Sequence, residues 1–260
     1  MIDWWDKQIQ RADCLAVSAN GAKNLLTFYA HLLRAQKRIY ESLRSRRDWL
    51  PTGDVEVDLP VVREQLPLLL EVVHKHGPPS LAEEARAWFG STEDSTSEML
   101  MTYWHCPSDV QFFGKACFQP YLRWSAATGA PPASREREQT EYCCPGCGGR
   151  PQVSFLQNKE AESGNRDLIC AVCLSTWEFR RVVCANCGEE RPSQLGYFHS
   201  PQWDHVRIEA CDTCKYYIKG IDLTRLGLAA PIVDDVDAAP LDLWATEHGY
   251  KKIELNLVGL

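Results

Sequence analysis

The chain has 260 residues, a formal net charge of −7 at pH 7, and a composition that is 45% hydrophobic and 24% charged. This balance is typical of a globular protein with a substantial core, in one large domain or two smaller ones. No apolar run is long enough to predict a membrane-spanning helix. The N-terminus, Met1 to Asp6, lacks the basic and apolar regions of a signal peptide, so we expect a cytoplasmic protein.

Residues 1–129 are expected to form an all-helical domain of five or six helices. From Lys23 to Arg47, apolar residues recur at intervals of three and four, which predicts a helix with one buried face. A second helix is expected to begin at Pro60, because proline suits the first turn of a helix. It should end in the segment 74–79, where cations precede glycine and proline.

Capping boxes predict three further helix starts, since each places Glu or Gln three residues after a serine. The boxes are Ser80 with Glu83, Ser95 with Glu98, and Ser108 with Gln111. The last of these helices contains Pro120, which is expected to kink or end it. We find no catalytic motif in this half of the sequence.

Eight of the twelve cysteines form four Cys-x-x-Cys pairs in the second half of the chain. The pairs are Cys144/Cys147, Cys170/Cys173, Cys184/Cys187 and Cys211/Cys214. Twenty-two residues separate the first two pairs and twenty-three separate the last two, but only ten lie between the second and the third. This spacing indicates a repeated module.

Paired cysteines at this spacing predict metal binding. Two intervening residues let both sulfurs of a tight turn point at one ion, and Gly148 and Gly188 permit the positive φ that such a turn needs. Two turns give a closed tetrahedral site of four thiolates, suited to zinc or iron. We therefore expect two metal ions, each bound by four cysteines.

The pairing of the four turns has two possibilities. The near-equal spacings favour sequential modules, in which the first pair joins the second and the third joins the fourth. A crossed arrangement, first with third and second with fourth, stays open. A redox-active Cys-x-x-Cys is a weaker alternative to metal binding, because thioredoxin-type motifs are normally single and lie at a strand–helix junction.

The segments between the turns have the character of β-hairpins. Residues 153–156 are expected to pair with 166–169 across a polar turn at 157–165, and 195–198 with 206–209. Each module alone has too little core to be stable. The metal is therefore expected to supply much of the folding free energy, on the order of 10 kcal/mol.

The predicted architecture is multidomain, with an all-helical part followed by small β modules. The expected parts are a helical domain at 1–129, a linker at 130–142, a first rubredoxin-like zinc-ribbon module at 143–181, a second at 182–222, and a tail with a short helix at 223–260.

Other candidate ligands are weaker. Cys143 is expected to be a spare thiol, because its side chain should point away from an ion held by Cys144. His199 and His205 are interpreted as loop residues. Four cysteines leave no open coordination position for a substrate, so the sites are expected to be structural and the protein is not expected to be an enzyme.

The cysteine motifs and the tail resemble the formate dehydrogenase accessory protein family (FdhE-like). The resemblance is carried by Cys144-Pro-Gly-Cys147-Gly, Cys170-Ala-Val-Cys173-Leu-Ser-Thr-Trp177, Arg181-Val-Val-Cys184-Ala-Asn-Cys187, Glu209-Ala-Cys211-Asp-Thr-Cys214-Lys-Tyr-Tyr217-Ile-Lys219, Asp234-Asp235, Leu241-Asp242-Leu243-Trp244 and Glu247-His-Gly249-Tyr250. The N-terminal half matches mainly as a helical domain of suitable length. Pro240 departs from the pattern, although proline is tolerated at a helix start.

The resemblance implies a cytoplasmic, non-catalytic assembly factor whose partner is the catalytic subunit of a respiratory formate dehydrogenase. An iron-containing, rubredoxin-like redox or oxygen-sensing protein is the alternative. A nucleic-acid-binding zinc ribbon is less favoured, because residues 144–214 hold more acidic than basic side chains. Neither nucleic acid nor membrane insertion is expected, and the choice between zinc and iron stays open.

Overall fold

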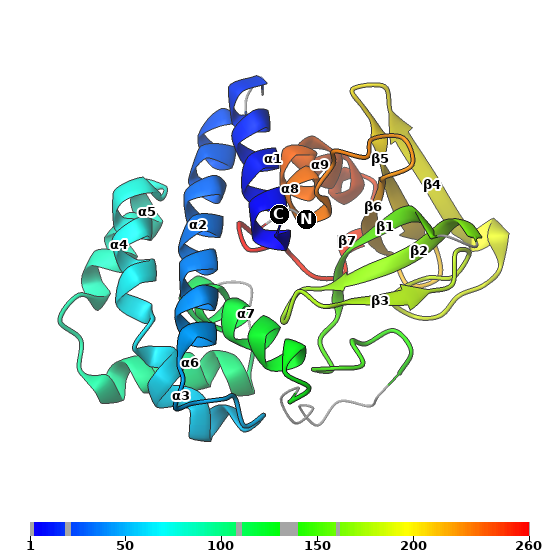
Figure 1. Cartoon of the computed structure of the whole chain (residues 1–260). Helices are drawn as coiled ribbons and strands as arrows, with labels where there is room; N and C mark the ends of the chain where they lie inside the picture. The colour runs from blue at the N-terminus through cyan, green and yellow to red at the C-terminus, as the bar shows by residue number, and fades with distance from the viewer. Residues whose placement is uncertain (1–2, 19–21, 108–110, 131–139, 160–161, 260) are drawn as a thin grey trace. The chain divides into compact units, whose positions relative to one another are not determined.

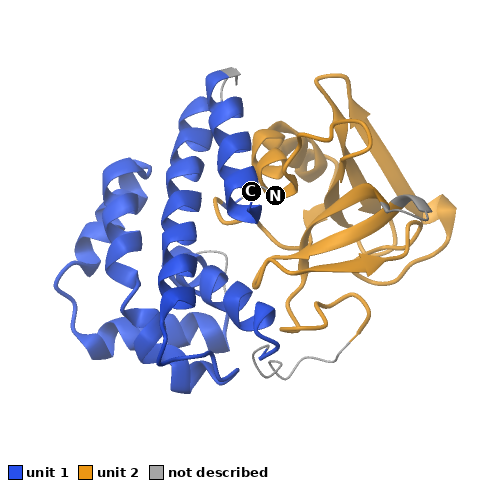
Figure 2. Ribbon diagram, in the orientation of Figure 1, with its two compact units in different colours: residues 1–137, 259 blue, residues 138–258, 260 orange. Residues whose placement is uncertain are grey.

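The computed structural model describes residues 3–18, 22–107, 111–130, 140–159 and 162–259. Residues 1–137 and 138–258 form two compact units (Figure 2). The first is helical, and the second is β-rich with two helices near its end (Figure 1). The predicted fold class is thereby confirmed, whereas the finer boundaries at residues 129, 142, 181 and 222 stay predictions. Within the described ranges, no helix combines the length and hydropathy needed to cross a bilayer.

Seven helices make up the described part of the first unit. They are α1 (Trp4–Ser18), α2 (Lys23–Ser45), α3 (Val55–Arg63), α4 (Leu66–His76), α5 (Pro79–Trp88), α6 (Glu93–His105) and α7 (Phe112–Ala127). α2 is the helix predicted from apolar periodicity, and it buries Leu26, Leu33 and Ile39 completely. It packs against α1, α4 and α7, so it forms the centre of the helical core.

The helix expected to begin at Pro60 begins five residues earlier, at Val55. Asp54 caps it, since its carboxylate accepts the backbone N–H groups of Glu56 (2.9 Å) and Val57 (3.3 Å). Pro60 therefore lies inside α3, which ends at Arg63 before α4 starts. The single helix predicted for this region is two short helices.

Two of the three capping boxes can be compared with the structure, because Ser108 lies outside the described residues. Ser80 does not cap α5, which begins one residue earlier at Pro79. α6 begins at Glu93, and Thr92 is its cap, accepting the backbone N–H of Ser95 at 3.2 Å. The second box thus indicated the right helix but placed its start too late.

Pro120 was expected to kink or end its helix, yet α7 continues to Ala127. Proline lacks the N–H that would bond to the carbonyl of Ala116, four residues earlier. The buried amide of Gln36 donates to that carbonyl instead, at 3.0 Å, and also to the side chain of Gln119 at 2.9 Å. A side chain from α2 therefore satisfies the group that Pro120 leaves without a partner.

The helical unit contains a stacked histidine pair. The rings of His31 in α2 and His76 in α4 lie 3.6 Å apart and are nearly parallel. Burial lowers the pKa of His31 from 6.5; the nearby His76, Arg34 and Lys75 lower it further, and Asp13 opposes them. The folded state therefore takes up a proton at lower pH than the unfolded state does.

This stack predicts a pH dependence of stability. The contribution of His31 is fully present above pH 6.5 and is lost as the pH falls through its lower folded-state pKa. We expect acidification from neutral pH to pH ~5 to lower the helical melting temperature more in the wild type than in His31→Phe, which keeps an aromatic ring. Far-ultraviolet circular dichroism measures this, and equal slopes in both proteins would contradict it.

The second unit is built on one sheet, seven-stranded over the residues described. Its strands are β1 (Pro151–Lys159), β2 (Glu162–Cys170), β3 (Thr176–Phe179), β4 (Leu195–Ser200), β5 (Trp203–Cys211), β6 (Tyr216–Asp222) and β7 (Lys251–Lys252), with a short 3₁₀ helix at Pro192–Gln194. The strand order is β3-β2-β1-β6-β5-β4, and β7 pairs with β6.

Both predicted hairpins are confirmed. β1 and β2 are antiparallel, with Val153 opposite Ile169, and β4 and β5 are antiparallel, with Phe198 opposite Ile208. The first hairpin is longer than expected: its strands reach Lys159 and Glu162, so most of the polar turn predicted at 157–165 is strand. Residues 160 and 161 lie outside the described residues.

A parallel pairing of β1 with β6 joins the two cysteine modules, which the spacing of the motifs does not predict. The register runs from Val153 opposite Lys219 to Leu156 opposite Asp222. β1 opens the first module and β6 closes the second. The two modules therefore share one continuous sheet, instead of forming two separate small sheets.

A buried ion cluster lies at this junction. Glu209 of β5 accepts from Arg166 of β2 (2.5 Å), Arg207 of β5 (2.7 Å) and Ser154 of β1 (3.0 Å). Burial alone would raise the pKa of Glu209, but the two arginines outweigh burial and hold it below its usual value. A Cβ at Gly220 of β6 would lie 2.4 Å from a Glu209 carboxylate oxygen, so a side chain there would displace this carboxylate.

The tail adds two helices to the sheet, where one was expected. These are α8 (Pro231–Asp237), which packs on β1 and β6, and α9 (Ala239–Glu247), which has Pro240 in its first turn. Lys219, completely buried in β6, bonds to the carboxylates of Asp235 (3.0 Å) in α8 and Asp242 (2.5 Å) in α9. Buried ion pairs therefore attach the tail to the sheet.

A second lysine completes this tail cluster. Lys252 of β7 bonds to Asp235 at 2.7 Å and lies 3.4 Å from Asp242. Burial would lower the pKa of Lys219 and raise that of Asp235, but the opposite charges reverse both directions. Two lysines and two aspartates thus form a neutral cluster, in which each charge depends on the others.

Candidate metal centres

Each cysteine quartet combines one turn in a loop with one turn at the end of a strand. In the first quartet, the turn Cys144–Cys147 precedes β1, and the turn Cys170–Cys173 starts at the last residue of β2. The second quartet repeats this plan: the turn Cys184–Cys187 precedes β4, and the turn Cys211–Cys214 starts at the last residue of β5. The sheet therefore fixes one half of each site.

All four turns have the same backbone conformation. The residue after the second cysteine has positive φ in each: Gly148 (68°), Leu174 (57°), Gly188 (75°) and Lys215 (59°). Its N–H donates to the carbonyl of the first cysteine, at 2.8–3.2 Å. Among the described residues, Leu174 and Lys215 are the only non-glycine residues with positive φ. Sequence inspection recognises this conformation at the glycines and misses it at the other two.

The sulfur positions decide between the two pairing schemes. Cys144 and Cys173 lie 3.6 Å apart and Cys147 and Cys170 3.4 Å apart (Sγ–Sγ). In the second quartet, Cys184–Cys214 is 3.7 Å and Cys187–Cys211 is 3.8 Å. Within each quartet all sulfurs lie within 4.8 Å of one another. The arrangement is therefore sequential, and the crossed alternative does not occur.

These distances fit a tetrahedral metal ion. A zinc–sulfur bond of about 2.3 Å gives a sulfur–sulfur edge of about 3.8 Å in a regular tetrahedron. Backbone N–H groups point at two of the sulfurs: Val172 at Cys170 (3.3 Å) and Asn186 at Cys184 (3.4 Å). Such donors stabilise thiolates. The residues present therefore suit zinc or iron, and each quartet leaves no position for a further ligand.

Electrostatics gives the same result. Burial raises the pKa of Cys170 and of Cys184, because a buried thiolate is poorly solvated. These thiols lose their protons only if a positive ion replaces the lost solvation, as a divalent metal ion does. Hydrogen bonds from the neighbouring cysteines instead lower the pKa of Cys144, so raised and lowered thiol pKa values occur together within the first quartet.

The two quartets differ in burial. No cysteine of the first quartet is more than 3% exposed. In the second, Cys184 and Cys211 are buried, but Cys214 is partly exposed and Cys187 is exposed. Cys143 belongs to neither four-cysteine group; the hydroxyl of Thr140 lies 3.6 Å from its sulfur. The expectation of a spare thiol agrees with this placement.

His205 does not lie in a loop, contrary to expectation. It belongs to β5, is 8% exposed, and its Nε2 lies 2.8 Å from Asp234 in α8. The β4–β5 turn is shorter than predicted, so this histidine falls within the strand. His199 is exposed and belongs to β4. Neither histidine belongs to a four-cysteine group.

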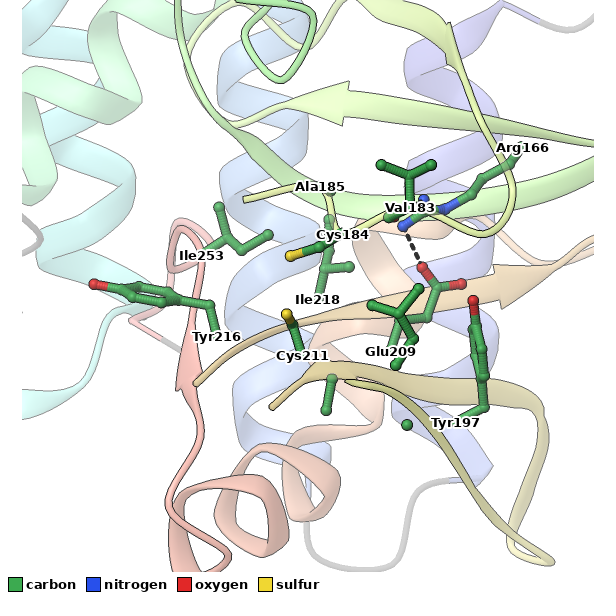
Figure 3. Close-up of a pocket in the computed structure, with 13 residues that line it drawn as sticks. Arg166, Val183, Cys184, Ala185, Tyr197, Glu209, Cys211, Tyr216, Ile218 and Ile253 are labelled. Carbon is green, nitrogen blue, oxygen red and sulfur yellow. Dashed lines mark hydrogen bonds and ion pairs between the residues drawn. The ribbon is translucent and has the colours of Figure 1, made fainter. Parts of the chain in front are cut away.

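Figure 3 shows a small cavity beside the second quartet. In this view Cys184 and Cys211 lie between two groups of lining residues: Tyr216 and Ile253 on one side, and the Arg166–Glu209 ion pair with Tyr197 on the other. Its volume is about 10 Å³, which suits a single water molecule. This cavity has no room for an organic substrate.

Two family models match the chain. The model described as FdhE, central domain, matches residues 143–181, and the model described as FdhE, C-terminal domain, matches residues 182–258. A "Protein FdhE homolog" of Aquifex aeolicus (strain VF5) is 30% identical over 256 residues, covering 92% of this chain and 89% of that protein. One of Stutzerimonas stutzeri (strain A1501) is 26% identical over 213 residues, covering 81% of this chain and 66% of the relative.

A solved structure has the same fold. The crystal structure of the FdhE protein from Pseudomonas aeruginosa superposes with a TM-score of 0.71 at 21% sequence identity, covering 98% of this chain and 94% of that one. The likeness extends over both the helical and the β-rich units.

Proposed function

Because this chain belongs to the FdhE family, we propose that it is a non-catalytic assembly factor that binds the catalytic subunit of a respiratory formate dehydrogenase in the cytoplasm. The observation that carries the proposal is the 30% identity to the Aquifex protein along nearly the whole of both chains. The formate dehydrogenase partner comes from the resemblance of the cysteine motifs and the tail.

The proposal includes two structural metal ions. Cys144, Cys147, Cys170 and Cys173 hold one ion, and Cys184, Cys187, Cys211 and Cys214 hold the other. Closed four-thiolate sites stabilise small folds and leave no coordination position for chemistry. Their role is then to stiffen the β-rich unit as a surface for protein binding.

Co-purification tests this function. A tagged form of the chain, expressed in a bacterium that makes a respiratory formate dehydrogenase, is expected to retain the catalytic subunit. Deletion of the gene is expected to lower formate-dependent dye reduction in cell extracts. A control uses the Cys143→Ser variant, which changes a cysteine outside both quartets. Expression of this variant in the deletion strain should restore formate-dependent dye reduction.

Two results together would overturn the proposal. They are failure of the metal-loaded protein to retain the catalytic subunit, and normal formate dehydrogenase activity in the deletion strain. If the tagged chain retained other proteins but not the catalytic subunit, this result would not support the proposal.

A redox or oxygen-sensing protein is the second candidate. The turn Cys144-Pro145-Gly146-Cys147-Gly148 favours it, because this sequence has the form of a rubredoxin iron site. Elemental analysis of protein prepared without added metal separates the two candidates. A reversible colour change on reduction would support iron redox chemistry, and colourless protein with firmly bound zinc would exclude it.

A further inference from the structure

The residues that surround and cover the two quartets differ at equivalent positions of the repeated module. Around the strand-end turn of the first quartet the residues are Ala171, Val172 and Leu174, all at most 8% exposed. The equivalent residues of the second quartet are Asp212, Thr213 and Lys215. Three apolar side chains in one module are thus replaced by three polar ones in the other.

The loop turns differ in the same way. In the first, Gly149 lies so close to the site that a Cβ there would be 2.8 Å from the Cys170 sulfur and 2.9 Å from Val172. The chain therefore closes tightly over the first quartet. In the second, the equivalent residue is Glu189, as the matching bonds from Cys144 to Gly149 and from Cys184 to Glu189 show.

Glu189 forms a polar bridge over the second site. Its carboxylate accepts from Thr213 (2.6 Å) of the strand-end turn and from Arg191 (2.7 Å), whose side chain is 69% exposed. The Glu189 side chain is only 9% exposed, but Arg191 lies largely in solvent, where water competes for its bonds and weakens an ion pair. The cover of the second quartet is therefore easier to open than the packed cover of the first.

We propose that the second quartet is an exchangeable, oxidant-sensitive metal site, whereas the first is a permanent structural site. Cys187, whose side chain is exposed, is where chelators, thiol reagents and peroxide reach the second ion. This inference rests on the proposed metal content of the chain. It divides one duplicated fold into a stable half and a responsive half.

Hydrogen peroxide is the oxidant class that the second quartet would sense. The Cys187 thiolate attacks one peroxide oxygen, the O–O bond breaks, and a sulfenic acid and hydroxide form. The Cys211 thiolate, 3.8 Å away, then attacks the Cys187 sulfur, forming a disulfide and releasing a second hydroxide. Two thiolates are oxidised, one peroxide is reduced, and the metal ion loses two ligands and leaves.

Metal release from the wild-type protein loaded with zinc tests the inference. With a chromogenic chelator in excess, we expect one equivalent of zinc to leave on the order of tenfold or more faster than the other, because the buried site needs a larger structural opening. Release of both equivalents at one rate would overturn the inference while leaving two bound metals in place. Absence of bound metal would overturn the metal proposal itself.

Site-resolved alkylation identifies which quartet reacts, without any variant. Under limiting iodoacetamide, mass spectrometry should find Cys14 and Cys106 labelled first, because both are exposed and lie outside the quartets. Cys187 and Cys214 should follow, with the first quartet labelled last. Labelling of Cys144 or Cys170 before Cys187 would overturn the inference.

Peroxide treatment supplies the final readout. One equivalent of zinc should be released together with a Cys187–Cys211 linked peptide, and dithiothreitol should reverse both changes. Release of both equivalents, or a disulfide within the first quartet, would contradict the assignment. Neither outcome depends on binding to formate dehydrogenase, so this test fails or succeeds separately from the proposed function.

Discussion

Replacing Cys144 with serine is expected to remove one metal ion and to unfold much of the β-rich unit. A four-thiolate metal site supplies on the order of 10 kcal/mol to a small fold, which is comparable with the whole stability of a typical domain. The effect should reach the second module, because β1 and β6 share one sheet. Elemental analysis should find one metal per chain, and circular dichroism should show loss of β structure.

Cys143→Ser provides the matched control. It makes the same chemical change one residue away, at a thiol outside both quartets. Metal content and denaturation midpoint should stay at wild-type values in this variant. Full metal content and unchanged stability in Cys144→Ser would contradict the ligand assignment.

Replacing Lys219 with methionine is expected to destabilise the chain by about 3–5 kcal/mol, the usual cost of breaking a buried ion pair. The substitution keeps the length of the side chain but leaves Asp235 and Asp242 with one lysine, Lys252, between them. Urea denaturation measures the loss. Lys215→Met is the matched control, because Lys215 pairs with Asp212 at an exposed site and its loss should barely change the urea denaturation midpoint.

A double substitution checks the physical reason. Lys219→Met with Asp242→Asn restores neutrality, so it should be less destabilising than the sum of the two single substitutions. Additive effects would show that the cluster acts through packing alone.

The helical unit shows where sequence patterns succeed and where they fail. The apolar periodicity of α2 predicted its position, because one side of this helix is buried along its length. Pro120 does not end α7, and the sequence could not show this because the compensating donor, Gln36, lies far away along the chain. Similarly, Asp54 caps α3, so this helix begins at Val55 and not at Pro60 as expected. Local rules cannot include partners supplied by tertiary contacts.

The two four-cysteine groups were predictable because their information is local. Cysteine spacing and the glycines after two of the turns identified all eight residues that the structure brings together. The near-equal spacings favoured sequential pairing, which the sulfur positions confirm. The different exposure of Cys187 and Cys147 could not be predicted, because it depends on the tertiary structure around each turn. The ion cluster around Lys219 was missed, since its members come from β6, α8, α9 and β7 and no short motif connects them.

The parallel contact between β1 and β6 has a consequence for synthesis on the ribosome. Antiparallel pairing with β2 covers one side of β1 early, but its other side has no neighbour until Asp222 has been made. Until then the nascent chain presents a bare strand edge, which favours association with other nascent chains. Truncation after the first module would make that edge permanent, so the first module without β6 is expected to associate with other chains.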